Sequence, residues 1–215
     1  MNPGDKPSGD FRDTDEALRQ TADDERFFPE ATSAGDQWQR VVMNEAIAGH
    51  IASLDPPSRR AAEISGDSHA HLPWREHLSL NYPEFDLCAP VGGRGQFDVV
   101  ICEQVLEHVV DPFRAAANLR ELTVPGGHVI VSTPFLIKVH EVAIMALRDY
   151  WRFTPRGLRT LLETVGLVVD SVDSWGNVPC VVGNLRRWSS YRPFHPLDND
   201  PDLAVQVWAF ARNPA

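Results

Sequence analysis

Two histidines stand where an imidazole could take part in proton transfer. His108 lies shortly after a β-branched apolar stretch that ends at Cys102, and His140 lies shortly after a second such stretch that ends at Thr133. An unperturbed imidazole titrates near neutral pH, so both side chains are candidate general bases. The alternative, for His108 above all, is a structural role in which the ring caps or packs against a neighbouring helix.

Three further histidines, His69, His71 and His77, lie in a stretch without clear periodicity. In an extended strand the pattern His-x-His places two imidazoles on one face, where they could begin a metal site. No cysteine or carboxylate stands at a spacing that completes such a site. We therefore expect an exposed, irregular loop here and no metal site.

The elements that must position these residues are clearest between residues 97 and 134. Apolar, β-branched runs over 97–102 and 128–133 are typical of strands buried on both faces. Between them, Asp111-Pro112 predicts the start of a helix, because aspartate caps free amides and proline suits the first helical position. Strand, helix and strand of these lengths predict a βαβ unit with parallel strands. We expect the inner face of the helix to consist of Phe113, Ala116, Leu119 and Leu122, and Pro125-Gly126-Gly127 to form a turn with a positive φ.

The same alternation continues on both sides of this unit. A helix is predicted over 36–54 and another from Thr154-Pro155 to Gly166, with strands over 61–64, 167–172 and 203–211. We expect the last strand at a sheet edge, an irregular segment over 67–83 and a loop over 175–201 that could cover a pocket. The pattern indicates an α/β fold with a doubly wound, mostly parallel sheet.

Composition and charge exclude several classes of protein. The chain has 215 residues, of which 43% are hydrophobic and 23% charged, as in ordinary globular proteins. Its formal net charge of -10 disfavours tight binding of nucleic acid. No apolar run approaches the roughly 18 residues of a membrane span, and residues 1–15 have no apolar stretch, so we expect neither a membrane segment nor a secretory leader. Three widely spaced cysteines favour a reducing cytoplasm.

The first 34 residues differ from the rest of the chain. They carry nine acidic and four basic side chains, a net charge of -5, and few apolar ones. Such a segment gains too little from burial to offset its ordering entropy. We expect residues 1–34 to form a mobile acidic tail, with a short helix around 13–20, and residues 35–215 to form the α/β domain.

An ordered series of motifs runs through the middle of the chain and resembles the class I S-adenosylmethionine-dependent methyltransferases, in particular the small-molecule group. The series consists of Phe97-Asp98-Val99-Val100, Val105-Leu106-Glu107-His108-Val109 with Asp111-Pro112, Pro125-Gly126-Gly127, Ser132-Thr133-Pro134-Phe135 with His140, and Asp149-Tyr150-Trp151-Arg152-Phe153-Thr154-Pro155 with Gly157-Leu158. The resemblance covers about residues 61–172. It implies a Rossmann-like sheet, S-adenosylmethionine as cofactor, and methyl transfer to an O or N atom of a small molecule.

The resemblance also implies where the cofactor binds. In an open parallel sheet the ligand lies beyond the carboxyl ends of the strands, at the switch point of the strand order. The implied cofactor-binding residues are Glu63, Ser65, Gly66, Asp86, Leu87, Glu103 and Gln104. Gly66 would let the nucleoside approach the backbone, Asp86 would accept a hydrogen bond from the adenine amino group, and Glu103 and Gln104 would meet the amino acid part or the sulfonium. Glu63 could instead hold a loop in place. Methyl transfer from an activated donor needs positioning and, for some acceptors, one general base, a role open to His108 or His140.

Two features depart from the family pattern. The nucleoside loop Glu63-Ile64-Ser65-Gly66-Asp67-Ser68 contains a single glycine. The stretch from Gly66 to Asp86 is also too short for the helix, strand, helix and strand that the family places there, so we expect one strand–helix unit to be missing. Glu84 or Asp86 could grip the ribose, but we assign Asp86 to the end of a third strand, which leaves the ribose without a clear acid.

Two functional hypotheses follow. The first is a methyltransferase that acts on a small-molecule acceptor, without nucleic acid or membrane partners. The second is a catalytically inactive methyltransferase-like domain that binds or regulates a partner, which the shortened front half motivates. Under either hypothesis, a protein partner or a homodimer is possible.

Overall fold

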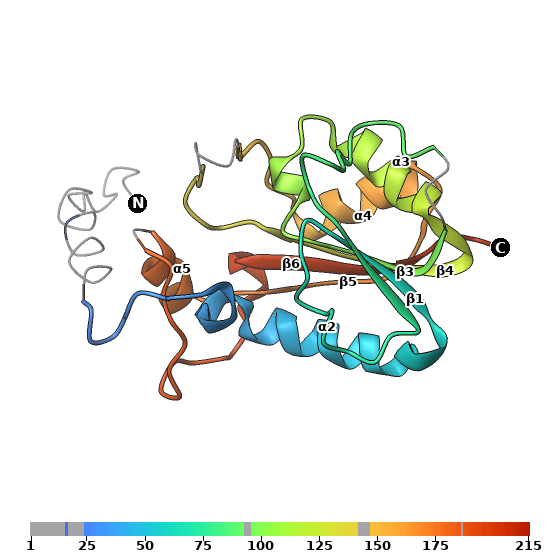
Figure 1. Cartoon of the computed structure of the whole chain (residues 1–215). Helices are drawn as coiled ribbons and strands as arrows, with labels where there is room; N and C mark the ends of the chain where they lie inside the picture. Colours follow the sequence, from blue (N-terminus) through green and yellow to red (C-terminus); the bar gives the residue numbers. More distant parts are fainter. Residues whose placement is uncertain (1–15, 17–23, 93–95, 142–146, 186) are drawn as a thin grey trace, which may run out of the picture.

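A six-stranded sheet forms the centre of the molecule (Figure 1). The computed structural model describes residues 16, 24–92, 96–141, 147–185 and 187–215, and the structural statements below concern this part of the chain. The strands are β1 (Arg60–Ile64), β2 (Glu76–Leu80), β3 (Phe97–Glu103), β4 (Thr123–Pro134), β5 (Val168–Trp175) and β6 (Gln206–Arg212). Their order in the sheet is β2-β1-β3-β4-β6-β5, in which β6 pairs antiparallel with both of its neighbours and the other pairs are parallel. The predicted α/β fold with a mostly parallel sheet is confirmed.

Helices cover both faces of this sheet. The α-helices are α2 (Val41–Ser53), α3 (Pro112–Leu122), α4 (Pro155–Thr164) and α5 (Val178–Asn184), and short 3-10 turns span Ala34–Asp36, Trp38–Arg40, Pro56–Ser58, Leu106–His108 and Pro201–Leu203. Helices α3 and α4 lie on one face and α2 on the other (Figure 1). Each face carries its own hydrophobic cluster of buried residues. The described part contains no helix that is both long and apolar enough to cross a membrane.

The helix starts that the sequence predicts are confirmed by their capping hydrogen bonds. The Asp111 carboxylate accepts from the backbone N–H of Arg114 at 3.0 Å, and Thr154 Oγ1 accepts from the N–H of Gly157 at 3.0 Å. Both side chains satisfy amides that have no partner within the helix. The predicted inner face of α3 is wrong at Phe113, whose exposed fraction is 55%, because the buried side of the first turn is formed by Pro112 and Ala115 instead.

The segment between β1 and β3 is more regular than predicted. Strand β2 lies within the expected irregular stretch and pairs with all of β1, from Arg60 opposite Glu76 to Ile64 opposite Leu80. The described residues between β1 and β3 hold this one strand and no helix, which confirms the missing strand–helix unit. The prediction that Asp86 ends a third strand is wrong. Asp86 follows the second strand, β2, because the chain leaves the sheet after Leu80.

The two ends of the chain also differ from the prediction. The last strand, β6, is not at an edge: it lies between β4 and β5, and most of its residues are buried. Before the predicted domain start at residue 35, Phe28 is only 1% exposed and its ring stacks with that of Trp38 at 6.4 Å between centroids. Glu30 forms an isolated antiparallel bridge with Ser189. The Phe28 side chain is therefore anchored in the core before residue 35, while the residues around it are half-buried or exposed. The predicted helix over 13–20 lies outside the described residues, except for Glu16.

Candidate active site

The parallel strands β1 and β3 each end in a sharp turn at the same edge of the sheet. Ser65 follows β1 and Gln104 follows the last residue of β3, and both have a left-handed backbone, with φ of 54° and 55°. Non-glycine residues adopt this conformation rarely, and mostly where the surrounding structure enforces it. The Gln104 side-chain amide donates to Gln206 Oε1 at 2.9 Å and to Ser132 Oγ at 3.2 Å. These bonds anchor the turn to β4 and β6.

Three adjoining cavities lie beyond these strand ends. The first, of about 390 Å³, is lined by Ser65, Asp86, Leu87, Gln104 and His108, among others. The second, of about 530 Å³, lies between α2 and the connection from β1 to β2, and includes Arg40, His69 and Glu103 in its wall. The third, of about 190 Å³, is lined by residues that include Arg40, Gln104, Glu107, His108, His140 and Trp188. Gln104 and His108 line both the first and the third cavity, and Arg40 lines both the second and the third, so neighbouring cavities share wall residues.

The wall of the first cavity that carries Asp86 is held from behind by a buried asparagine. Asn118, on α3, donates from Nδ2 to the carbonyl oxygens of Leu87 at 2.6 Å and Ala89 at 2.7 Å. Asp86 Oδ1 accepts from the N–H of Cys88 at 2.8 Å. Asp86 and Leu87 both line the first cavity, and the hydrogen bonds from Asn118 hold this part of its wall in place. The sequence did not point to Asn118, because an asparagine in a helix has no distinctive signal.

Glu63 and Gly66 do not face these cavities in the predicted way. The two oxygens of Glu63 accept from the N–H groups of Ser68 at 2.8 Å and His69 at 3.0 Å, and Oε2 lies 3.2 Å from His77 Nε2. A Cβ added at Gly66 would lie 3.0 Å from Glu63 Oε1, so the space beside this glycine is filled by protein. Neither residue is among those that line the three cavities. Glu63 holds the loop in place, the alternative left open by the sequence.

In the second cavity, Glu103 pairs with a histidine from that same loop. His69 Nε2 lies 2.6 Å from Glu103 Oε1. Burial lowers the pKa of His69, but the hydrogen bond and the charge of Glu103 raise it further, so the net shift is upward. His69 and His71 do not converge as the metal alternative requires, because His71 Nδ1 lies against the carbonyl oxygen of Ser68 instead.

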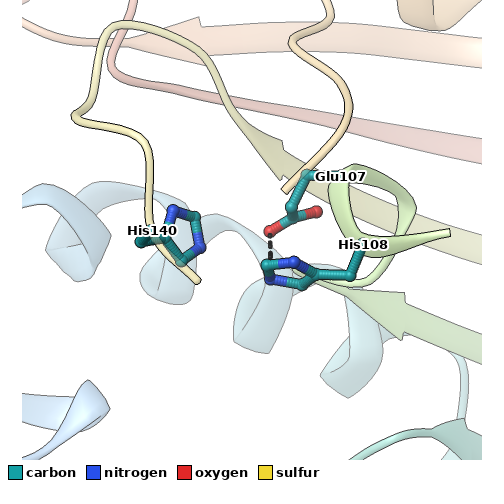
Figure 2. A group of neighbouring side chains, drawn as sticks. All are labelled: Glu107, His108 and His140. Carbon is teal, nitrogen blue, oxygen red and sulfur yellow. Dashed lines mark ion pairs between the residues drawn. The ribbon is translucent and has the colours of Figure 1, made fainter. Parts of the chain in front are cut away.

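The third cavity contains a buried carboxylate beside two imidazoles (Figure 2). Glu107 is fully buried, and neither of its oxygens has a hydrogen-bond partner within the described residues. Burial raises the pKa of Glu107 to about 8, although its own backbone N–H and the charge of Arg40 act in the opposite direction. His108 Nε2 lies 3.7 Å from Glu107 Oε1, and the rings of His108 and His140 are 5.0 Å apart and nearly perpendicular.

Neighbouring groups hold both imidazoles in place. His108 Nδ1 lies 2.5 Å from the carbonyl oxygen of Arg148. The backbone N–H of His140 donates to Asp149 Oδ2 at 2.8 Å, and its Nδ1 lies 3.2 Å from the same oxygen, outside hydrogen-bond geometry. Asp149 is itself ion-paired with Arg152. Burial lowers the pKa of both His108 and His140, which favours neutral rings able to accept a proton.

Comparisons with known proteins identify the family of this chain. A family model described as a methyltransferase domain matches residues 10–172. The chain belongs to the class I S-adenosylmethionine-dependent methyltransferases. The ubiquinone biosynthesis O-methyltransferase of Coxiella burnetii is 26% identical to this methyltransferase over 169 residues, which are 77% of this chain and 68% of the relative.

Solved structures share the fold of this methyltransferase. The 1,6-didemethyltoxoflavin-N1-methyltransferase of Burkholderia thailandensis, solved with bound 1,6-didemethyltoxoflavin and S-adenosylhomocysteine, superposes with a TM-score of 0.55 at 14% identity. The superposition covers 99% of this chain and 94% of that protein. The [4+2]-cyclase SpnF superposes with a TM-score of 0.53 at 13% identity, over 87% of both chains. Because this fold hosts more than one reaction, the structural likeness establishes architecture, and the family match establishes the chemistry.

The methyltransferase therefore uses S-adenosylmethionine to methylate a small molecule, as the motifs predicted. The comparisons give no support to the inactive-domain alternative. The first cavity combines apolar walls from Phe85 and Leu87 with the exposed carboxylate of Asp86, beyond the carboxyl ends of the strands.

Sequence analysis missed two charged residues of this site. Arg40 is the last residue of the short turn Trp38–Arg40, lines the second and third cavities, and is the one arginine or lysine in their described walls. Glu107 was read as part of a motif without a role. The signal that could have found it is its position directly before His108, in a segment otherwise made of valine and leucine.

Proposed function

We propose that the enzyme transfers the methyl group to a hydroxyl oxygen of a small, flat acceptor bound in the third cavity. The adenosine of the cofactor would occupy the first cavity, and its amino acid end would extend toward Arg40. The relative from Coxiella burnetii, named as an O-methyltransferase, supports oxygen as the acceptor atom. The rings of Trp188 and His140, which meet edge to face at 5.3 Å, support a flat acceptor.

One observation carries this proposal. The buried Glu107 carboxylate, without a partner among the described residues, lies with His108 and His140 in a cavity that shares Gln104 and His108 with the first one. Burial keeps both imidazoles neutral near neutral pH, so either can accept a proton, and the Glu107 carboxyl, with its pKa raised to about 8, becomes an acceptor as the pH rises through that value. Proton acceptors would thus lie beside the sulfonium end of a cofactor whose adenosine occupies the first cavity.

The protein has little covalent chemistry to do in such a reaction. When bound, S-adenosylmethionine supplies a methyl carbon on a positively charged sulfur, and that sulfur keeps the electron pair of the carbon–sulfur bond when the methyl leaves. The acceptor oxygen must then lose one proton as its bond to carbon forms. The tasks left to this chain are to align oxygen with carbon and sulfur, to exclude water, and to take up that proton on the Glu107, His108 and His140 group.

Cofactor binding is tested by calorimetry with S-adenosylhomocysteine. We expect the full chain to bind it, and Asp86→Ala to weaken binding about 10-fold or more, because one charge-assisted hydrogen bond to the adenine is lost. Asp173→Ala changes an exposed aspartate on the edge strand β5 and is the matched control, which should bind as the parent does. Unchanged affinity in Asp86→Ala would contradict the placement of the adenosine.

Methyl transfer is tested with a panel of phenols, catechols and amines, read by mass spectrometry. We expect Glu107→Gln to lower kcat by about 100-fold or more while leaving the affinity for S-adenosylhomocysteine within about twofold, since general acid–base groups contribute this much. Glu121→Gln alters an exposed carboxylate on α3 and serves as the control. Products methylated only on nitrogen, or full activity in Glu107→Gln, would contradict the proposal.

We also make a proposal about the location of the enzyme and another about the bounds of its folded unit. We place the enzyme in the cytoplasm, which the three free cysteines support. We also treat residues 24–215 as the folded unit, because Phe28 packs against the rest of it.

A further inference from the structure

Three metal-ligating side chains converge in the third cavity. Glu107, His108 and His140 each offer one donor atom, and these atoms all lie within 4.8 Å of one another (Figure 2). Around a tetrahedral zinc ion, donor atoms stand about 3.4 Å apart, given bonds of about 2.1 Å. A shift of about 1 Å in the side chains would therefore close the group around an ion.

The buried carboxylate gives independent support for a ligand. Glu107 is fully buried, and both of its oxygens are without a hydrogen-bond partner among the described residues. A buried polar group left unpaired is costly, so such groups in native proteins are paired with protein, water or an ion. Gln39, from the wall of the same cavity, also has a buried side-chain oxygen without a partner in this part of the chain. The wall of the cavity thus contains three buried oxygens, two from Glu107 and one from Gln39, that have no hydrogen-bond partner among the described residues.

The surroundings of the imidazoles are those of metal ligands. Metal-bound histidines typically direct their second ring nitrogen to a backbone carbonyl or a carboxylate. His108 Nδ1 lies 2.5 Å from the Arg148 carbonyl oxygen, and His140 Nδ1 lies 3.2 Å from Asp149 Oδ2. The contact with Arg148 orients the His108 ring and leaves Nε2 toward Glu107, while the Asp149 carboxylate lies beside His140 Nδ1 without a hydrogen bond to it.

We propose that Glu107, His108 and His140 bind one divalent transition-metal ion of the zinc type. Two imidazoles and one carboxylate suit such an ion better than magnesium or calcium, which prefer oxygen ligands. Three protein ligands leave a coordination position open, and the acceptor hydroxyl would bind there. The ion would then orient the oxygen and ease loss of its proton, which would pass to the Glu107 oxygen that does not bind the ion; this role rests on the proposed function, while metal binding itself does not.

The test uses the full chain, freed of metal with a chelator and titrated with Co²⁺, whose visible absorption reports coordination by protein nitrogen. We expect one equivalent to bind with the intense bands of a low-coordinate site, and Zn²⁺ to displace it. His140→Ala and Glu107→Gln should each weaken Zn²⁺ binding by more than about 100-fold, beyond the 10–100-fold typical of residues that only orient a ligand. Circular dichroism of each variant checks that it folds.

A matched control separates this site from the other histidines. His71→Ala removes an exposed imidazole from the loop between β1 and β2, and should bind Co²⁺ as the parent does. Absence of a one-equivalent complex in the parent, or equal binding by His140→Ala and the parent, would overturn the proposal. Loss of binding in His71→Ala together with full binding in His140→Ala would overturn it as well.

Calorimetry with S-adenosylhomocysteine on the metal-free chain keeps the two proposals apart. If S-adenosylhomocysteine binds and Co²⁺ does not, the metal site is refuted and the proposed function stands. If Co²⁺ binds as expected but no acceptor is methylated at oxygen with Zn²⁺ or Co²⁺ restored, the metal site stands and the proposed function fails.

Discussion

The burial of Phe28 makes a strong prediction about the segment that the sequence assigns to a mobile tail. Phe28 is 1% exposed, packs in the cluster on the α2 face, and stacks with Trp38. Its ring also fills the space beside Gly183, where an added Cβ would lie 2.6 Å from the Phe28 ring. Removal of this side chain by Phe28→Ala therefore leaves a void beside Trp38 and Gly183.

The expected cost follows from this burial. Transfer of a phenylalanine side chain from water contributes about 1.5–3 kcal/mol, and the cavity left behind adds to the loss, so Phe→Ala in a core costs about 3–5 kcal/mol. For a chain of this size, each kcal/mol lowers Tm by roughly 2–4 °C, so Tm should fall by roughly 6–20 °C. Urea unfolding should show a lower midpoint with an unchanged slope.

Phe113→Ala is the matched control, because this phenylalanine is 55% exposed on the first turn of α3. We expect it to change the free energy of unfolding by less than about 1 kcal/mol. If Phe28→Ala costs no more than Phe113→Ala, then residues 24–34 are not part of the folded unit, and the reasoning from burial is refuted.

Three other changes test the supports of the site. His69→Gln removes the partner of Glu103. Because the pKa of His69 is raised in the fold, the pair stabilises the protein fully below the unfolded pKa of about 6.5, and less as the pH rises through the folded pKa. The free energy of unfolding in urea should therefore depend less on pH in the variant than in the parent. Asn118→Ala leaves two backbone carbonyls, including that of Leu87, without their donor. The free energy of unfolding in urea should fall by about 1–3 kcal/mol, and calorimetry should show weaker binding of S-adenosylhomocysteine. Unchanged affinity would show that the first cavity does not need this support. Gly127→Ala brings a Cβ to 2.9 Å from two carbonyl oxygens, so the denaturation midpoint should fall by the equivalent of about 1–3 kcal/mol, and an unchanged midpoint would mean that the strand can shift without strain.

The sequence was informative where structure is decided by near neighbours. The helix starts at Asp111 and Thr154 rest on hydrogen bonds to amides three residues further on, so the local sequence contains the whole signal. The central strands β3 and β4 are buried on both faces, and their continuous apolar runs reflect it. The motifs that led to the methyltransferase family lie on these same elements.

Features that depend on distant partners could not be predicted in this way. Strand β2 is short and half-exposed, so its composition resembles a loop, and its pairing with β1 depends on a connection without a helix. The interior place of β6 depends on the order of strands in space. Arg40 and Glu107 meet at one cavity only because a 3-10 turn near the N-terminus folds over the end of β3. A buried carboxylate is also unexpected from sequence, since glutamate is rarely fully buried.

The connection between β1 and β2 has a consequence for local opening of the backbone. Residues 65–75 take the place of a whole strand–helix unit, and the single carboxylate of Glu63 binds the N–H groups of both Ser68 and His69. His69 is also held by Glu103 and by the Trp74 indole N–H, which donates to its carbonyl oxygen at 2.9 Å, so loss of the Glu63 contacts alone leaves the connection attached. We expect the amides of Ser68 and His69 to exchange with deuterium faster in Glu63→Gln than in the parent, while those of β3 keep their slow exchange.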